Sequence, residues 1–134
     1  MTRPRHEVAL LETSVLVDFD PGLVGRYTGA GPVATMTLAE LSNGLYTADP
    51  IENARREAHY YWITAHFEPI GFDERTARTF GAVCQAVRTA GRNSPPRAFD
   101  LLIAAVALAN GFALITRNEA DFRGLPAALT VVGI

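Results

Sequence analysis

Short apolar segments alternate with longer segments of helical pattern along the whole chain, and this alternation limits the folds open to it. Strands separated by helices favour a parallel or mostly parallel sheet with helices on both faces. The expected strands cover residues 8–11, 33–36, 69–72, 112–116 and 129–132, and the expected helices cover residues 14–19, 37–46, 50–66, 74–90 and 98–109. The sequence therefore predicts an α/β fold in one domain, residues 1–134.

The length predicts one domain, and the lack of a membrane-spanning stretch or export signal leads us to expect a cytoplasmic location. The chain has 134 residues, and its longest apolar stretch, residues 101–108, is far shorter than the ~20 residues that cross a bilayer. We find no export signal at the start of the sequence, and the single cysteine, Cys84, cannot form an internal disulfide. A net charge of −2 gives no overall electrostatic attraction to nucleic acid.

Four acidic side chains stand where a strand passes into a helix or in the opening turns of a helix. They are Glu12, Glu40, Asp100 and Asp121, with Asn118 close to the last. Such positions can meet at the carboxyl edge of a parallel sheet. Several carboxylates at close range must hold a cation or keep some of their number protonated. The pattern predicts a magnesium (Mg²⁺) or manganese (Mn²⁺) site, and hence phosphate chemistry by a metal-activated water.

Each acid except Glu12 also has a purely structural interpretation. Thr37 and Glu40 have the spacing of a capping box at a helix start. Asp100 would suit the dipole of the helix it opens, and Asp121 and Asn118 could cap a short turn. Glu12 is the hardest to explain structurally, because glutamate is a poor strand residue and a charge placed there is costly unless paired or coordinating.

Hydroxyl and guanidinium groups near these acids extend the candidate site. Ser14 and Thr116 could bind a metal-bound water or a phosphate, although capping and strand-end bonding are commoner roles for such hydroxyls. Arg97 and Arg117 flank the acidic segments and could steer phosphate, or equally form surface salt bridges. Glycine-rich phosphate-binding motifs and a nucleophile elbow do not occur in the sequence.

Four sequence segments resemble the conserved motifs of PIN-domain proteins. They are LLETSVLVD, TLAEL, FDLLIAAVALANG and LITRNEADF, in the family's order and at its usual spacings, and together they span about residues 9–132. The last two segments are quite specific as a pair. The chain's size also matches the VapC-type toxins of bacterial toxin–antitoxin modules.

This resemblance implies a Mg²⁺- or Mn²⁺-dependent endoribonuclease. Glu40, Asp100 and Asp121 match the family's acidic positions, and Asn118 matches a neighbouring polar one. Glu12 would coordinate the metal directly or through water. The family resemblance further implies a homodimer, a structured RNA substrate such as tRNA or rRNA, and a cognate VapB-type antitoxin whose tail reaches the acidic groove, often with an arginine.

The resemblance departs from the family pattern at Glu12, where aspartate is usual. Three interpretations follow: a natural variant that tolerates the longer side chain, a weakly active or degenerate scaffold, or a deliberate attenuation of a toxic protein. We expect retained metal binding with reduced activity, and we keep as the alternative a scaffold that binds antitoxin or RNA without cleaving. A phosphoacceptor signalling domain is disfavoured because the chain contains no lysine.

Overall fold

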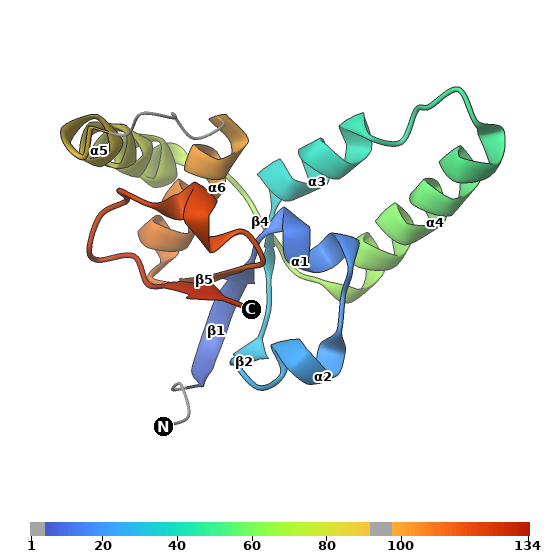
Figure 1. The fold of residues 1–134 in the computed structure, drawn as a ribbon, viewed down its shortest axis with the longest axis horizontal. Helices are drawn as coiled ribbons and strands as arrows, with labels where there is room; N and C mark the ends of the chain where they lie inside the picture. The colour runs from blue at the N-terminus through green and yellow to red at the C-terminus, as the bar shows by residue number, and fades with distance from the viewer. Residues whose placement is uncertain (1–4, 92–97) are drawn as a thin grey trace.

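A four-stranded parallel sheet forms the centre of the molecule (Figure 1). The computed structural model describes residues 5–91 and 98–134. The sheet has the strand order β2-β1-β5-β6, and β3 and β4 form a separate two-stranded parallel sheet. The strands are β1 His6–Leu11, β2 Thr28–Ala30, β3 Val33–Ala34, β4 Pro69–Ile70, β5 Ala113–Thr116 and β6 Val131–Gly133. The predicted α/β class with a mostly parallel sheet is confirmed.

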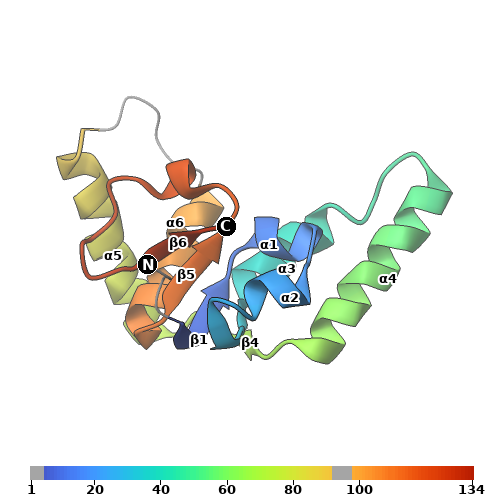
Figure 2. The ribbon, with the colours of Figure 1, turned by 60° about the horizontal axis from the view of Figure 1, so that its bottom comes forward.

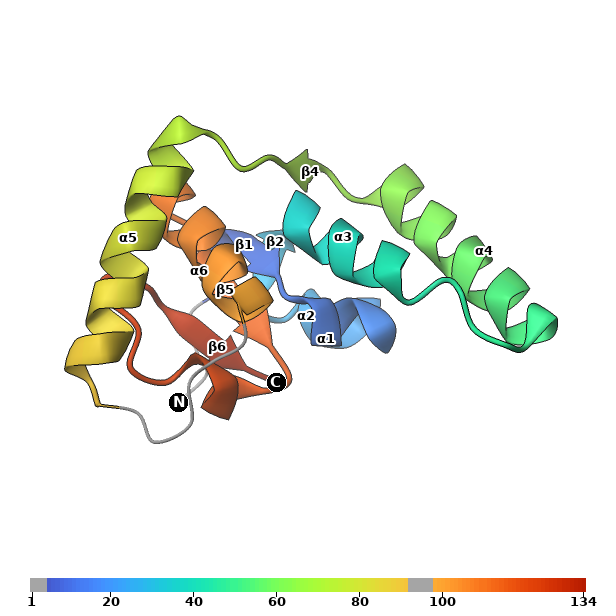
Figure 3. The same ribbon diagram turned by 90° about the horizontal axis from the view of Figure 1, so that it is seen from above.

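Helices lie on both sides of this sheet. They are α1 Thr13–Val17, α2 Pro21–Val24, α3 Thr35–Asn43, α4 Pro50–His66, α5 Glu74–Thr89 and α6 Ala98–Asn110, with the short 3₁₀ helix η1 at Glu119–Phe122. Helices α5 and α6 lie together on one side, while α1 to α4 lie on the other (Figure 2). Helices α3 and α4 run side by side and extend away from the sheet as an arm (Figure 3).

The alternation of side chains along the two central strands explains why both faces are covered. Leu10 and Leu114 belong to a core cluster formed with α5 and α6. Leu11 and Ile115, one residue further along each strand, belong to a second cluster formed with α1, α2 and α4. Because successive side chains of a strand point to opposite faces, two adjacent positions on each strand supply both cores.

Several helix ends follow the local sequence signals closely. Asp49 caps α4 through the backbone N–H of Ile51, and a proline stands directly after the cap. Gly111 has a φ of 69° after the last residue of α6. The N–H of Phe112 bonds the carbonyl of Ala107, which is the Schellman pattern of a helix that ends at a left-handed glycine.

Two elements were not expected from the sequence. The breaker-rich segment at residues 20–22 forms α2, with Asp20 as its cap and proline at its first position. Strand β2 has Gly29 at its centre. Pairing of His6 with Thr28 along β1 holds this strand, so an edge contact overrides the low strand propensity of glycine.

The expected capping box at Thr37 and Glu40 is wrong. Strand β3 ends at Ala34, and α3 begins at Thr35 with no side-chain cap. Thr37 is therefore inside the helix, fully buried, and Glu40 lies in the helix interior. Arg97, predicted to steer phosphate, falls outside the described residues. Within the described ranges, no helix is long and apolar enough to cross a membrane.

Replacing Gly31 by alanine tests the packing beneath β1. A Cβ atom at Gly31 would lie 2.7 Å from Cδ1 of Leu11, whose side chain is 1% exposed and cannot move into solvent. We expect Gly31→Ala to lower the free energy of unfolding by about 1–3 kcal/mol. Chemical denaturation measures this value.

Gly81→Ala is the matched control. Gly81 lies within α5 and has no atom within 4 Å of the position that a Cβ would occupy. This substitution should raise the free energy of unfolding by about 0.5–1 kcal/mol, because glycine is a poor residue for a helix interior. A Gly31→Ala protein as stable as the unaltered one would contradict the packing described.

Candidate functional site

The turn that leaves β1 places Glu12 in the interior of the molecule. Glu12 is 2% exposed and caps α1. Its Oε2 accepts a hydrogen bond from the N–H of Ser14 at 2.9 Å. Its Oε1 accepts from the hydroxyls of Ser14 at 2.7 Å and Thr116 at 2.5 Å. Three donors thus compensate the burial of this carboxylate, which would otherwise be costly.

The same two hydroxyls hold the backbone that follows β5. The N–H of Arg117 donates to Ser14 Oγ at 2.9 Å, and the N–H of Asn118 donates to Thr116 Oγ1 at 3.0 Å. The Glu12 carboxylate is therefore connected through two side chains to the segment leading into η1. This segment carries Asn118 and then Asp121.

Thr13 connects the turn to α3. Its hydroxyl donates to Glu40 Oε1 at 2.7 Å and lies 3.2 Å from the hydroxyl of Thr37. Thr37 is fully buried, and Glu40 is partly exposed. Thr13, backed by the buried hydroxyl of Thr37, thus orients a carboxylate that solvent can reach.

Asp100 enters the site from the opposite side of the sheet. It lies in the first turn of α6 and is 2% exposed. Helix α6 packs against α3, which carries Glu40, and against η1, which carries the half-buried Asp121. Helix α6, which bears Asp100, therefore contacts both elements that bear the other two of these acids.

The side chains themselves do not form a metal cage as they stand. Among the described residues, no three histidine, cysteine, aspartate or glutamate side chains are grouped so as to hold a metal ion. The oxygen donors still suit a hard divalent cation, and Mg²⁺ commonly binds through one or two carboxylates while keeping several waters. The chemistry of Glu40 and Asp100 therefore fits such an ion.

The remaining predicted residues have mixed placements. Asn118 is exposed and stands at the cap of η1 without a side-chain capping bond. Arg117 donates from a terminal guanidinium nitrogen to the carbonyl of Asp18 at 2.7 Å, and its Nε is buried without a hydrogen-bond partner. Arg117 thus binds a backbone carbonyl, and neither of the two ion pairs found among the described residues includes it. Its predicted role toward phosphate stays a prediction.

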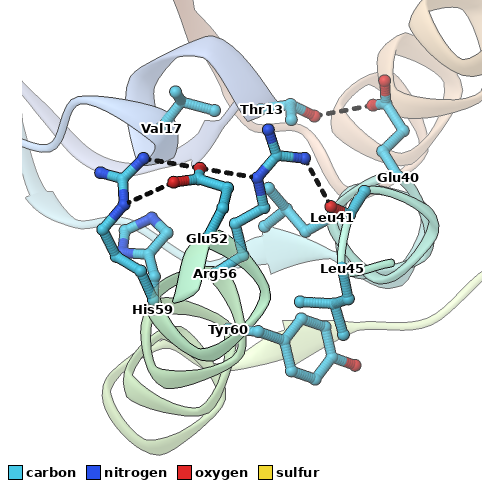
Figure 4. A pocket seen from close by; sticks show the side chains of 11 residues that line it. Thr13, Val17, Glu40, Leu41, Leu45, Glu52, Arg56, His59 and Tyr60 are labelled. Atoms are coloured by element: carbon cyan, nitrogen blue, oxygen red, sulfur yellow. Dashed lines mark hydrogen bonds and ion pairs between the residues drawn. The ribbon is translucent and has the colours of Figure 1, made fainter. Parts of the chain in front are cut away.

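A cleft of about 550 Å³ opens beside Glu40, between α1, α3 and α4 (Figure 4). Thr13 and Glu40 lie at one end of it, and side chains of α4 form the facing wall. Its apolar lining comes from Val17, Leu41, Leu45 and Tyr60.

Three charged residues of α4 line the middle of this cleft. Glu52 accepts hydrogen bonds from Arg55 at 2.6 Å and Arg56 at 2.9 Å. Arg56 also donates to the carbonyl of Gly44 at 2.6 Å, which joins α4 to the end of α3. Sequence analysis missed this group, although the spacings of three and four residues are those of ion pairs along a helix. It likewise missed Thr37 as a buried support for Glu40.

The chain as a whole is similar to known proteins. The family model of the PIN domain matches residues 9–127. The chain is 32% identical to Ribonuclease VapC4 of Mycobacterium tuberculosis over 123 residues, covering 88% of this chain and 91% of that protein. A VapBC-5 structure from the same organism superposes with a TM-score of 0.80 at 27% identity, covering 96% of this chain and 99% of that one. VapBC of Salmonella typhimurium, solved bound to DNA, has the same fold, with a TM-score of 0.77 at 19% identity over 96% and 98% of the two chains.

Acid should weaken the contacts of Glu52 in a defined pH range. Hydrogen bonds from Arg55 and then Arg56 lower the pKa of Glu52 from 4.5 to about 2. Because the pKa is lower in the folded protein, this stabilisation is complete above about pH 4.5 and is lost as the pH falls toward 2. We expect thermal unfolding to distinguish Glu52→Gln from the unaltered protein at neutral pH and no longer to do so near pH 2.

Glu57→Gln is the control for this measurement. Glu57 is an exposed glutamate of the same helix, and it takes part in neither of the two ion pairs found among the described residues. A difference between Glu52→Gln and the unaltered protein that persists unchanged to pH 2 would contradict the proposed ion pairs.

Proposed function

The chain belongs to the PIN-domain family, and on this premise we propose that it is a metal-dependent endoribonuclease, the toxin component of a toxin–antitoxin module. The observation that carries the proposal is the contact of α6, which bears Asp100, with both α3 and η1, which bear Glu40 and Asp121. The likeness to a protein named as a ribonuclease supports the same conclusion. The proposed substrate is a structured RNA such as tRNA or rRNA.

In this proposal Glu40 and Asp100 hold a Mg²⁺ or Mn²⁺ ion, with Asp121 completing the acidic cluster. When bound, such an ion activates a water and neutralises charge that develops on the phosphodiester. Thr13 keeps the Glu40 carboxylate oriented through its 2.7 Å hydrogen bond. Asp100 would hold the ion from the first turn of α6. Arg117 and Asn118, the first two residues after β5, would contact the RNA.

We propose that the cleft between α1, α3 and α4 receives a segment of a VapB-type antitoxin. Its walls combine apolar surface with the acidic Glu40 at one end. A peptide carrying an apolar side chain and an arginine would match both features, because a guanidinium forms strong paired hydrogen bonds with a carboxylate. The structural neighbours from VapBC complexes support a partner of this class. A homodimer and a cytoplasmic location are proposed from the family alone.

Cleavage of total cellular RNA by the purified, antitoxin-free protein tests the enzymatic proposal. We expect discrete RNA fragments with Mg²⁺ or Mn²⁺, and none with EDTA. Asp100→Asn should reduce the cleavage rate by on the order of 100-fold or more, since it removes a charge that holds the ion. Circular dichroism should show that this near-isosteric variant is folded. Cleavage that persists in EDTA or in the variant would refute the metal-dependent mechanism.

The same assay separates the enzyme from a scaffold that binds without cleaving. Glu12, whose side chain is longer than the family's usual aspartate, is the feature that favours the scaffold that binds without cleaving. If the folded protein does not cleave, Glu12→Asp is the next variant. Cleavage by Glu12→Asp would identify an attenuated nuclease, whereas continued inactivity would favour a binding-only role for this chain.

A pair of adjacent tyrosines tests the antitoxin proposal. Tyr60 is half-buried and lines the cleft, whereas Tyr61 is 61% exposed and does not line it. We expect Tyr60→Ala to weaken binding of the cognate antitoxin by on the order of 10-fold or more, as for a central interface aromatic. Tyr61→Ala, the matched control, should bind as the unaltered protein does. Equal effects of the two substitutions in titration calorimetry would contradict this binding site.

A further inference from the structure

Glu12 and Glu40 are presented to a ligand in different ways. Glu40 is partly exposed in the wall of an open cleft. Glu12 is 2% exposed, and its carboxylate accepts three hydrogen bonds from Ser14 and Thr116. A carboxylate offers about four lone-pair positions, so the protein's own donors occupy most of those on Glu12.

We propose that Glu12 is a positioning residue, which fastens the end of β1 to the end of β5 and does not bind the catalytic metal directly. This inference rests on the metal-dependent function proposed above. Mg²⁺ gives up its own waters reluctantly. To reach Glu12, the ion would have to displace hydroxyl donors at 2.5 and 2.7 Å. Glu40, in contrast, is partly exposed in the wall of the cleft, where the hydroxyl of Thr13 donates to one of its oxygens.

The contacts of Glu12 indicate what it positions. The hydroxyls of Ser14 and Thr116 donate to its carboxylate and accept from the N–H groups of Arg117 and Asn118. Loss of the carboxylate would remove the acceptor that both hydroxyls share. The hydroxyls would then fix the segment that leads to Asp121 less firmly.

The glutamate side chain has the length that this bridge requires. One carboxylate both caps the N–H of Ser14 and reaches the hydroxyl of Thr116. Aspartate is a good helix cap, but its carboxylate would end roughly 1 Å or more short of Thr116, because it lacks one methylene group. The departure from the family's usual aspartate thus coincides with a bridge that the longer side chain makes.

Titration calorimetry with Mn²⁺ on the purified, antitoxin-free chain tests the proposal. Glu12→Gln and Thr116→Val should each weaken Mn²⁺ binding by about 10- to 100-fold, the usual cost of losing a group that orients metal ligands. The double variant should bind about as weakly as either single one, because both substitutions break the same bridge. Asp100→Asn should abolish binding.

A different order of Mn²⁺ affinities among these variants would overturn the proposal. If Glu12 coordinates the metal directly, Glu12→Gln should abolish Mn²⁺ binding as Asp100→Asn does, while Thr116→Val leaves the affinity nearly unchanged. Thr116→Ser separates positioning from general packing, because it retains the hydroxyl and removes only a methyl group. We expect Thr116→Ser to restore the Mn²⁺ affinity that Thr116→Val loses, and a failure to restore it would count against a positioning role.

Unfolding of the metal-free protein distinguishes a failure of this inference from a failure of the proposed function. Glu12→Gln and Thr116→Val should lower the thermal midpoint by less together than the sum of their separate effects, as residues in direct contact do. Additive effects would refute the bridge. If the unaltered protein binds no Mn²⁺, the metal-dependent function and the metal-related part of this inference both fail. The non-additive effect of the two substitutions on the thermal midpoint would still show whether the bridge between Glu12 and Thr116 exists.

Discussion

Only Glu12 separates β1 from α1, so this residue and the first two of α1 are close enough to the sheet to connect it to several neighbouring elements. Glu12 is bonded to the end of β5, Thr13 to α3, and Ser14 to the backbone of Arg117. Consecutive side chains leave a tight turn in different directions, and each here meets a different element. The relative placement of α3 and the segment after β5 therefore depends on hydrogen bonds to one short turn.

The contacts of the glutamates in and near the candidate site differ with their exposure to water. The buried Glu12 has three hydrogen-bond donors, which offset the cost of removing a charge from solvent. The partly exposed Glu40 is oriented by Thr13 and remains open to the cleft. Glu52, in the same cleft, is instead neutralised by two guanidinium groups. Of these three glutamates, only Glu40 combines access from the cleft with a position beside the predicted acidic site.

Local chemistry predicted the parts of the fold that depend on neighbouring residues. The cap at Asp49 and the left-handed Gly111 were readable because their signals lie within one turn of chain. Thr37 was misassigned, because the end of β3 depends on pairing with β4 and not on its own sequence. The partner of Glu12 was not readable at all, since Thr116 lies 104 positions later. The sequence pattern indicated Glu12 and Thr116 as candidate site residues, but it contains no signal that the two side chains are hydrogen-bonded.

Glu40 belongs both to the cleft and to the group of acids that would hold the metal. Under the functions proposed, the inhibitor and the chemistry therefore depend on the same carboxylate. A substitution at this position that freed the chain from its inhibitor would also remove a ligand that catalysis requires. Evolutionary escape from neutralisation would thus have to occur elsewhere in the cleft, such as at Leu45 or Tyr60, where the wall is apolar and distinct from the acidic site.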